Sequence, residues 1–248
     1  MTPYLSVIIT NYNEEANLRQ GLLDELLTRV KKYDFSWELL LVNDGSTDAT
    51  LELLKSYTAG DSRIRLLDNP HQGKAAGIIS GALEAKGRII LFTDMDQSTP
   101  IDEFEKFIPQ FKAGFSVVIG SRARREGAPL FRQVLAFGMV VLRTLVLQLP
   151  IRDSQCGFKA FTREAARKIF SILKIVHPLK VITYPTTNPG FDLEILYLAR
   201  KLKFKIDEVP VTWYYRESKR VTFFKDAVNG LKELLLVRWR SFTKAYKI

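Results

Sequence analysis

Short runs of apolar residues alternate with longer amphipathic segments along the first half of the chain. The apolar runs predict strands at 5–10, 38–43, 64–68, 88–93 and 116–121. The amphipathic segments predict helices at 14–32, 48–57, 74–86 and 101–112. A run such as LLLV at 39–42 is apolar at every position, which is typical of parallel strands covered on both faces. The alternation predicts an α/β fold, a doubly wound and mostly parallel sheet with helices on both faces.

Polar residues follow four of these strands. The sequences at the strand ends are TNYNEE at 10–15, NDGSTD at 43–48, NPHQGK at 69–74 and DMD at 94–96. In open α/β sheets, ligands bind just beyond the carboxyl ends of the strands. Polar turns follow strands in many proteins, but four such ends in one sheet favour a site for a sugar, a base or a metal ion.

The fourth strand end carries two carboxylates one residue apart, Asp94 and Asp96. Such neighbours repel each other unless a cation lies between them and a phosphate ligand. Mg²⁺ and Mn²⁺ are hard cations that bind through one or two carboxylates together with substrate phosphates. The pattern therefore predicts a site for Mg²⁺ or Mn²⁺ at Asp94 and Asp96.

Composition narrows the expected partners. The 248 residues carry a net charge of +10, which favours an anionic partner such as a phosphorylated substrate, an acidic membrane surface or nucleic acid. No nucleic-acid-binding motif is present, so nucleic acid is not expected. Cys156 is the only cysteine, which excludes an intrachain disulfide and favours a cytosolic location. Because the chain has only this cysteine and two histidines, a zinc site is not expected. Cys156 is predicted to lie in the core.

Other phosphate-binding motifs are absent. Lys74 follows Gly73, but Asp68 stands where a P-loop needs its first glycine. Gly73, Gly77 and Gly81 do not follow the GxGxxG pattern of dinucleotide-binding loops. Their regular spacing instead predicts that a helix packs closely on the sheet.

Several ordered motifs resemble those of a known family. VNDGSTD at 42–48, QGKAAG at 72–77, DMD at 94–96 and IGSR at 119–122 are similar to motifs of the family 2, GT-A-type inverting glycosyltransferases. Two further segments resemble the branch of dolichyl-phosphate glucosyltransferases and polyprenyl-phosphate glycosyltransferases: IRDSQCGFK at 151–159 and FDLEILYLARK at 191–201. The chain departs from the family pattern at Thr10, Asn43, Met95, Gln97 and the segment 180–189, which leaves the sugar open.

The resemblance implies a nucleotide-sugar donor, with a UDP-sugar favoured, and a role for Mg²⁺ or Mn²⁺. It implies that Asp44 accepts hydrogen bonds from the base and that Asp96 holds the metal at the diphosphate. The metal would stabilise the charge that develops on the leaving nucleoside diphosphate. The nucleotide-binding residues that it implies are Thr10, Tyr12, Glu14, Asp44, Gly73, Lys74 and Asp94.

Basic residues after the fifth strand suggest the acceptor side of the site. Arginine binds phosphate through two parallel hydrogen bonds and stays charged. Arg122 and Arg132 match family positions near the acceptor phosphate, whereas Arg124 and Arg125 have no clear match. A solvated basic loop is the alternative for this set of arginines. A second cluster lies in a stretch that the family uses near the diphosphate or the acceptor: Arg216, Ser218 and Lys219.

The implied acceptor, a polyprenyl or dolichyl phosphate, simplifies the chemistry. A sugar hydroxyl needs a general base to become a nucleophile. A phosphate monoester has a second pKa near 6 and is mostly a dianion at neutral pH. The catalytic candidates are Asp96, Asp153, Arg122 and Arg132. Asp153 would orient the acceptor or act as a base, and simple pairing with Arg152 is its structural alternative.

Two apolar segments predict contact with a membrane surface. Segment 130–149 is apolar on most faces, with Arg132 and Arg143 spaced to reach lipid headgroups. Segment 221–248 has an apolar side surrounded by basic residues, which include Lys225, Lys232, Arg238 and Arg240. Such amphipathic helices lie in the membrane interface, although covering the protein core is the alternative.

We expect neither a spanning helix nor a signal peptide, because no run of about 18 apolar residues is present and no basic segment precedes the first strand. The expected attachment is peripheral, on the cytosolic face of a membrane, with a membrane-protein partner as another possibility. The expected organisation is a glycosyltransferase domain at 1–220, which includes an interface helix at 129–149, and a basic amphipathic helix at 221–248.

The favoured function is metal-dependent transfer of a sugar, glucose from UDP-glucose, to a polyprenyl or dolichyl phosphate. Two enzymatic alternatives stay open: mannosyl transfer from GDP-mannose to the same acceptor, and transfer to a non-lipid glycan. An alternative of another class is a nucleotide-binding regulator at the membrane surface that has no turnover.

Overall fold

The computed structural model describes residues 2–122, 130–178, 180–182, 190–214 and 223–248, and their side chains except at 130–136 and 223–227. Among these residues a seven-stranded sheet has the order β3-β2-β1-β4-β6-β5-β7. All neighbouring strands are parallel except β6, which is antiparallel to both β4 and β5. The strands are β1 Leu5–Asn11, β2 Trp37–Asp44, β3 Ile64–Asn69, β4 Ile89–Thr93, β5 Val117–Ser121, β6 Lys159–Thr162 and β7 Ile206–Pro210.

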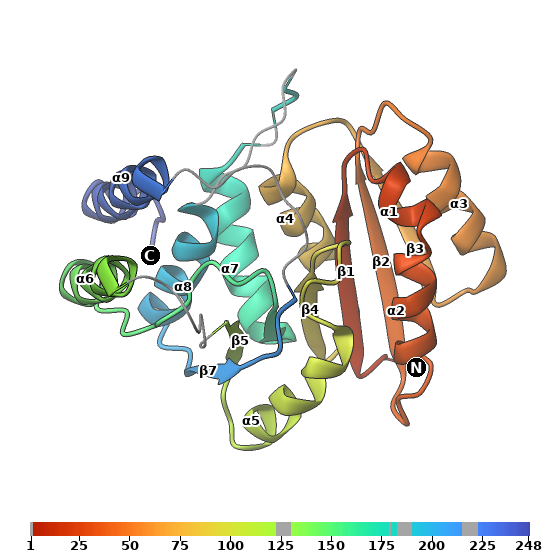
Figure 1. Ribbon diagram of the computed structural model, residues 1–248, viewed down its shortest axis with the longest axis horizontal. Helices are drawn as coiled ribbons and strands as arrows, with labels where there is room; N and C mark the ends of the chain where they lie inside the picture. The colour runs from red at the N-terminus through yellow and green to blue at the C-terminus, as the bar shows by residue number, and fades with distance from the viewer. Residues whose placement is uncertain (1, 123–129, 179, 183–189, 215–222) are drawn as a thin grey trace.

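Helices cover both faces of this sheet (Figure 1). One face packs against α1 Glu15–Arg19, α2 Leu22–Val30, α3 Thr50–Gly60, the 3₁₀ helix η1 Ile101–Phe107 and α5 Ile108–Lys112. The other packs against α4 Lys74–Glu84, α7 Arg163–Val176 and α8 Gly190–Lys201, with α6 Leu130–Leu147 and α9 Phe223–Phe242 outside them. The predicted doubly wound, mostly parallel α/β fold is confirmed.

Strand β2 shows why the strands are apolar at successive positions. Every one of its residues is buried. Leu39 and Leu41 belong to the core cluster on one face of the sheet, and Leu40 and Val42 to the cluster on the other. Because neighbouring side chains point to opposite faces, a strand covered on both sides needs apolar residues throughout.

Two predicted helices are interrupted. The segment predicted as one helix at 14–32 forms α1 and α2, because Gly21 adopts the left-handed conformation with a φ of 77° and ends the first helix. The segment predicted at 101–112 starts as η1 and becomes α-helical only at Ile108, where Pro109 occupies the first turn of α5.

The close packing predicted from the glycines of α4 is confirmed for Gly77 and Gly81. A Cβ atom on Gly77 would lie 2.9 Å from the Cγ2 atom of Thr10, and one on Gly81 would lie 2.6 Å from the Cγ2 atom of Ile8. Larger residues would therefore push α4 away from β1. Gly73 differs, because it precedes the helix with a φ of 90°.

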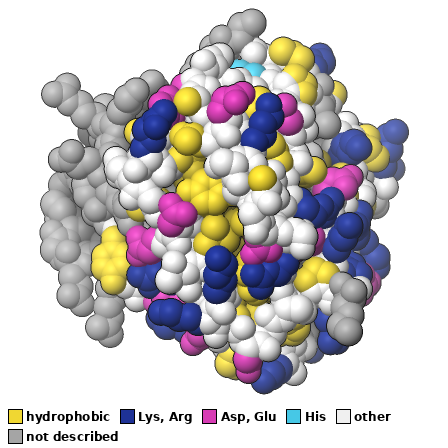
Figure 2. Space-filling view, turned by 90° about the vertical axis from the view of Figure 1, so that its right-hand side faces the viewer, with side chains coloured by type: hydrophobic (Ala, Val, Ile, Leu, Met, Phe, Trp, Pro, Cys, Tyr) yellow, Lys and Arg dark blue, Asp and Glu magenta, His cyan; other side chains and the backbone are white. Residues whose placement is uncertain are grey.

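The two outer helices carry exposed apolar side chains. On α6 these include Phe137 and Leu145, and on α9 they include Leu235, Trp239 and Phe242. In contrast, acidic and basic side chains are interspersed on the face that carries α1 to α3 (Figure 2). Within the described ranges, no helix is long and apolar enough to span a membrane.

Two arginines of these helices face the protein, which corrects the prediction that they contact lipid. Arg143 of α6 is 9% exposed and donates a hydrogen bond to the Oγ atom of Ser154. Arg240 of α9 donates to the Oε1 atom of the buried Glu194 at 2.8 Å. Both guanidinium groups are held by polar groups of the protein that the local helical pattern does not reveal.

Helix α9 shares the core of the main domain. Leu234 and Val237 are buried in the same cluster as Leu196 and Leu198 of α8. The boundary predicted between residues 220 and 221 lies outside the described residues and stays a prediction.

Candidate functional site

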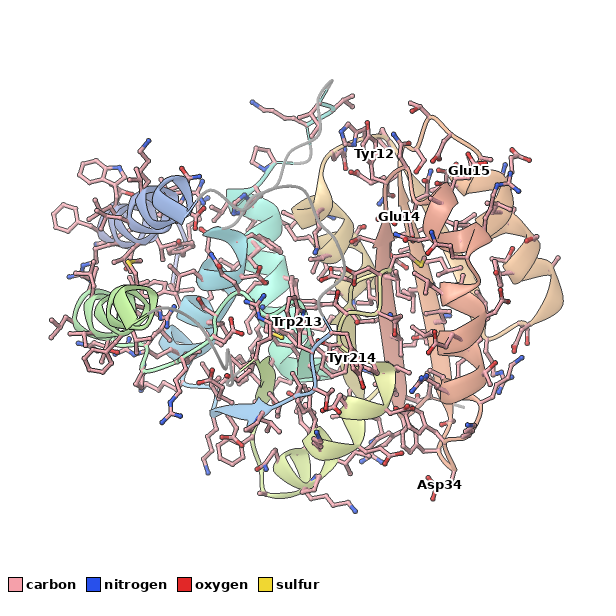
Figure 3. All side chains as sticks on the ribbon, viewed as in Figure 1. Tyr12, Glu14, Glu15, Asp34, Trp213 and Tyr214 are labelled. Carbon is pink, nitrogen blue, oxygen red and sulfur yellow. The ribbon has the colours of Figure 1, made fainter. Side chains whose placement is uncertain are left out.

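The register of the parallel strands brings the predicted site residues to one edge of the sheet. Asn11 at the end of β1 pairs with Asn43 of β2, and Ile9 pairs with Thr93 at the end of β4. Tyr12, Asp44 and Asp94, which follow or end these strands, therefore lie at the same edge. Tyr12 and Glu14 are seen at this edge in Figure 3.

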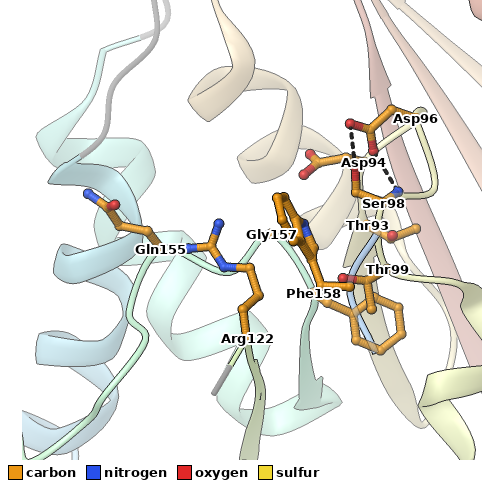
Figure 4. A pocket seen from close by; sticks show the side chains of 10 residues that line it. Thr93, Asp94, Asp96, Ser98, Thr99, Arg122, Gln155, Gly157 and Phe158 are labelled. Atoms are coloured by element: carbon orange, nitrogen blue, oxygen red, sulfur yellow. Dashed lines mark hydrogen bonds between the residues drawn. The ribbon is translucent and has the colours of Figure 1, made fainter. Parts of the chain in front are cut away.

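A cavity of about 180 Å³ opens beside this edge (Figure 4). It brings together three predicted residues, Asp94, Asp96 and Arg122, from the ends of β4 and β5. The complete lining among the described residues is Thr93, Asp94, Asp96, Ser98, Thr99, Arg122, Gln155, Gly157, Phe158 and Trp213.

A tight turn after β4 positions the two carboxylates. Met95, between them, is 3% exposed and packs in the core, whereas Asp94 and Asp96 line the cavity. Both oxygens of Asp96 accept hydrogen bonds from Ser98, one from its backbone N–H and one from its hydroxyl, each at 2.9 Å. Gln97 adopts a φ of 50° and donates to the backbone carbonyl of Asp94 at 2.8 Å. Asp96 therefore has a fixed orientation toward the cavity.

Asp94 is paired with Lys74, the first residue of α4. The ammonium group keeps the pKa of Asp94 below its usual value. The two side chains are 41% and 50% exposed, so the pair is open to solvent. The structure thus brings together Lys74 and Asp94, which were both predicted to bind the nucleotide.

The carboxylates fit a metal that shares its ligands with a substrate. Across the part of the chain that the structure describes, no group of three or more His, Cys, Asp or Glu residues forms a complete metal site. Mg²⁺ and Mn²⁺ often take one or two carboxylates and complete their coordination with substrate phosphates and water. Asp94 and Asp96 provide that number of carboxylates.

Asp44 organises the turn before α4. Its side chain is 3% exposed, and its two oxygens accept hydrogen bonds from the backbone N–H groups of Gln72 at 2.7 Å and Gly73 at 2.9 Å. The Nδ1 atom of His71 lies 2.9 Å from the same carboxylate. The ring of Tyr12 stacks on His71 with centroids 4.0 Å apart. Asp44, Gly73 and Tyr12 are therefore brought together, and both oxygens of Asp44 are already engaged by protein groups.

Glu14 and Thr10 have different surroundings. Burial raises the pKa of Glu14, and the nearby charges of Asp96 and Asp94 raise it further, so Glu14 lies within electrostatic range of the cavity. The side chain of Thr10 instead faces α4, where it contacts Gly77. Thr10 is not among the residues that line the cavity.

Arg122 and Asp153 form a fork-shaped ion pair. The Nε and Nη2 atoms of Arg122 donate to the two oxygens of Asp153 at 2.7 and 2.8 Å, and the backbone N–H of Arg122 donates at 3.0 Å. Burial by itself would raise the pKa of Asp153, but the hydrogen bonds and charge of Arg122 lower it overall. Asp153 thus holds Arg122 in place, and the alternative pairing with Arg152 does not form.

Four residues of the site were not predicted as functional. Trp213 lies beside the guanidinium carbon of Arg122, which is 5.7 Å from its ring centroid. A Cβ atom on Gly157 would lie 2.2 Å from the Oδ2 atom of Asp94, so a larger residue there would displace this carboxylate. Two positions after Gly157, the fully buried Lys159 donates to Asp192 at 2.7 Å. The segments with family resemblance at 151–159 and 191–201 contain three of them, which was the available signal.

The remaining acceptor candidates are not tested by the structure. Arg124, Arg125, Arg216, Ser218 and Lys219 lie outside the described residues. Arg132 belongs to α6, but its side chain is also outside them.

Residues 6–170 match the family described as glycosyl transferase family 2. This match covers most of the sheet and the cavity residues up to Phe158. The chain belongs to glycosyl transferase family 2.

Within this family, the chain is similar to curated proteins of one kind, the dolichyl-phosphate beta-glucosyltransferases. The chain is 39% identical over 224 residues to a dolichyl-phosphate beta-glucosyltransferase of Trichomonas vaginalis, covering 85% of this chain and 65% of the relative. It is 33% identical over 264 residues to the dolichyl-phosphate beta-glucosyltransferase of Drosophila melanogaster, covering 98% of this chain and 77% of the relative. The chain thus spans about two thirds to three quarters of the length of these two relatives.

Solved structures show the same fold. Glucosyl-3-phosphoglycerate synthase from Mycobacterium tuberculosis, in complex with phosphoglyceric acid, superposes with a TM-score of 0.62 at 16% identity, covering 95% of this chain and 80% of that one. A second structure of that protein contains Mn²⁺, UDP-glucose and phosphoglyceric acid, with a TM-score of 0.53 at 17% identity, covering 95% and 79%. At these identities the likeness concerns the fold alone.

Proposed function

We propose that this chain transfers a sugar from a nucleotide-sugar donor to a polyprenyl or dolichyl phosphate, with glucose from UDP-glucose as the favoured donor reaction. One observation carries the proposal: a single cavity brings Asp94 and Asp96 opposite Arg122 in a member of a glycosyltransferase family. The names of the similar dolichyl-phosphate beta-glucosyltransferases support this choice of acceptor and sugar.

The donor binds on the side of Asp94 and Asp96. These carboxylates would hold Mg²⁺ or Mn²⁺, which when bound neutralises charge on the leaving diphosphate. Lys74, now paired with Asp94, lies close enough to contribute a second positive charge. Tyr12, Glu14, Asp44 and Gly73 form the nucleoside end, where Asp44 keeps the turn before α4 in place. The complex of the structural neighbour with Mn²⁺ and UDP-glucose supports a divalent cation and a UDP-sugar.

The acceptor phosphate binds on the side of Arg122. A phosphate oxygen attacks the anomeric carbon of the sugar while the bond from that carbon to the diphosphate oxygen breaks, so the configuration inverts and the nucleoside diphosphate leaves. The phosphate is already a dianion at neutral pH, so no base has to remove a proton. This agrees with the ion pair that engages Asp153, because a carboxylate with a lowered pKa is a poor general base. Arg122 neutralises the acceptor phosphate and orients it.

The outer helices suit attachment to a membrane that holds the lipid acceptor. Trp239 and Phe242 of α9 are 64% and 77% exposed, and Leu145 of α6 is 74% exposed. Helices α6 and α9 pack against each other, so these side chains belong to one layer of the molecule (Figure 1). Exposed basic residues, such as Lys232 and Arg238, would add attraction to anionic lipid. We infer peripheral binding at the cytosolic face, with a membrane-protein partner as the competing explanation for these exposed side chains.

A transfer assay tests the proposal. Purified protein is given a panel of UDP- and GDP-sugars with a short polyprenyl phosphate and Mg²⁺ or Mn²⁺, and lipid-linked sugar is measured. UDP-glucose should give product, and chelation should stop it. If GDP-mannose were the only donor that gives product, the proposed reaction would be mannosyl transfer and not glucosyl transfer. Transfer only to a glycan would contradict the proposed lipid acceptor. Nucleotide binding without any product would favour a regulator that has no turnover.

A further inference from the structure

The main chain at residues 151–154 is held from one side by a carboxylate on the edge strand of the sheet. Glu208 of β7 accepts the backbone N–H of Arg152 at 2.8 Å and that of Asp153 at 2.6 Å, one on each oxygen. One carboxylate thereby fixes two successive peptide groups of this segment, which we call the 151–154 turn. These N–H groups have no place in a strand or helix, so Glu208 provides their acceptors.

The other side of the 151–154 turn is held by Arg143 of α6. Its Nη1 atom donates to the hydroxyl of Ser154 at 2.8 Å, and its Nη2 atom donates to the carbonyl oxygens of Ile151 and Arg152. Arg143 is 9% exposed, and burial of a charge is costly unless it is paired or hydrogen-bonded. An arginine that donates to carbonyls and a glutamate that accepts from N–H groups therefore hold the 151–154 turn together.

The 151–154 turn determines where Asp153 is, and Asp153 determines where Arg122 is. Asp153 binds the guanidinium of Arg122 through two side-chain hydrogen bonds and accepts a third from its backbone N–H. Arg122 lines the cavity, whereas Glu208, Arg143 and Asp153 do not. A continuous path of hydrogen bonds thus leads from β7 and α6, through one turn, to the arginine that lines the cavity.

We propose that Glu208 and Arg143 are positioning residues for Arg122, which act by fixing the 151–154 turn. The consequence for turnover rests on the proposed function, in which Arg122 orients the acceptor phosphate. Loss of either residue should leave the nucleotide side intact, because that side is built from the ends of β1, β2 and β4. A misplacement of about 1 Å at a catalytic group can cost on the order of 10² in rate.

The main test is Glu208→Gln, with Asp207→Asn as its matched control on the same strand. Glutamine presents an NH₂ group to one of the two backbone N–H donors, so the fork cannot form. The position of Arg122 is followed by the hydrogen exchange of its Nε–H in ¹⁵N NMR spectra, with the signal assigned by its loss in Arg122→Lys. This readout does not depend on turnover. The Nε–H should be protected in the wild type and in Asp207→Asn, and should exchange fast in Glu208→Gln.

Kinetics then separates positioning from a general loss of structure. Glu208→Gln should lower kcat by on the order of 10² without changing the affinity for UDP in the presence of Mn²⁺. In the background of Asp153→Asn, the same substitution should have no further effect on kcat, since the path is already broken. Arg143→Gln should repeat this pattern, Arg143→Lys should restore part of the rate, and Arg152→Gln should behave as the wild type.

An Nε–H of Arg122 that stays protected in Glu208→Gln would overturn the inference, whether or not transfer is observed. An equal loss of kcat in the wild-type and Asp153→Asn backgrounds would also overturn it. The absence of transfer by the wild type with every donor and acceptor would instead contradict the proposed function and leave the NMR result to decide the positioning role.

Discussion

Two residues that line the cavity, Asp94 and Arg122, each belong to a carboxylate–cation pair, and the two pairs are built in opposite ways. Asp94 and Lys74 meet through one contact, and their side chains are 41% and 50% exposed. Asp153 and Arg122 meet through three hydrogen bonds, and their side chains are 16% and 20% exposed. The first pair lies where the donor is proposed to bind, and the second lies on the proposed acceptor side.

This difference shows how similar residues can serve different purposes in one site. Exposed ion pairs contribute little to stability, so Asp94 can exchange Lys74 for another cation more readily than Asp153 can exchange Arg122. A partly buried, fork-shaped pair is lost only at a large cost, since each charge would remain without its partner. Asp153 is therefore fixed as a support for Arg122, whereas Asp94 and Asp96 remain available to a ligand.

The largest expected effect is that of Asp96→Asn, which can be compared directly with Asp153→Asn. Asp96→Asn should lower kcat by on the order of 10³, because charge on the leaving diphosphate is no longer compensated, and it should barely change the free energy of unfolding. Asp153→Asn should lower both quantities, because Arg122 keeps a buried charge. Transfer kinetics and urea unfolding measure the two effects. Near-normal turnover of Asp96→Asn, or of the wild type in excess chelator, would exclude the metal role.

The same contrast can be tested on α9, where two arginines lie two positions apart. Arg240 is paired with Glu194, which is 2% exposed and also accepts a hydrogen bond from the hydroxyl of Tyr246 at 2.7 Å. Arg240→Gln should lower the free energy of unfolding by about 3 kcal/mol, since it leaves a buried carboxylate with one fewer cation.

Arg238 is exposed and provides the matched control. Arg238→Gln should leave the free energy of unfolding unchanged but weaken binding to anionic liposomes by about 1 kcal/mol. Urea unfolding and liposome sedimentation measure the two quantities. Equal stability of the two variants would mean that the pair of Arg240 and Glu194 contributes nothing to folding.

A smaller effect on activity is expected when one methyl group, added at Gly157, disturbs the pair of Asp94 and Lys74. A Cβ atom on Gly157 would meet the Oδ2 atom of Asp94 at 2.2 Å and force this carboxylate to move. Gly157→Ala should therefore reduce kcat/KM for the donor by on the order of 10². Gly60→Ala, at a position with no atom within 4 Å of the added Cβ, should retain normal kinetics. Normal donor kinetics of Gly157→Ala would show that the position of Asp94 is not important.

The smallest effect concerns Glu233, a partly buried carboxylate within electrostatic range of another carboxylate. Burial, with a contribution from the charge of Asp192, raises the pKa of Glu233 on α9 to about 7. A raised pKa in the folded state gives stability that is complete below the ordinary value of 4.5 and is lost as the pH rises through 7. The free energy of unfolding should fall across this window in the wild type, and Glu233→Gln should remove that part of the decrease. An identical slope in both proteins would contradict the assignment.

The side of the site that carries Asp94 and Asp96 was easier to predict from the sequence than the side that carries Arg122. Asp94 and Asp96 directly follow an apolar strand, and parallel strands bring their carboxyl ends to one edge, so local patterns are enough to place them. The four residues of β6 were missed because such a short strand has no clear period. The other half depends on contacts between distant residues, such as Glu208 with Asp153, which are 55 positions apart. No local pattern encodes such a pair.

The outer helices illustrate the same limit. Arg143 and Arg240 interrupt apolar helical segments, and local sequence favours lipid contact for both. Their actual partners, Ser154 and Glu194, come from other parts of the fold. The last helix does carry exposed apolar side chains, which include Val228, Leu231 and Leu235.

The division of the cavity into a donor side and an acceptor side is tested most directly by calorimetry of UDP binding in the presence of Mn²⁺. Binding is measured for the wild type, Asp96→Asn and Arg122→Lys, and each is also assayed for transfer. Asp96→Asn should lose the metal-dependent part of UDP binding together with transfer. Arg122→Lys should bind UDP as the wild type does and still lose transfer. Equal losses of UDP affinity in both variants, or full affinity in Asp96→Asn, would contradict this division.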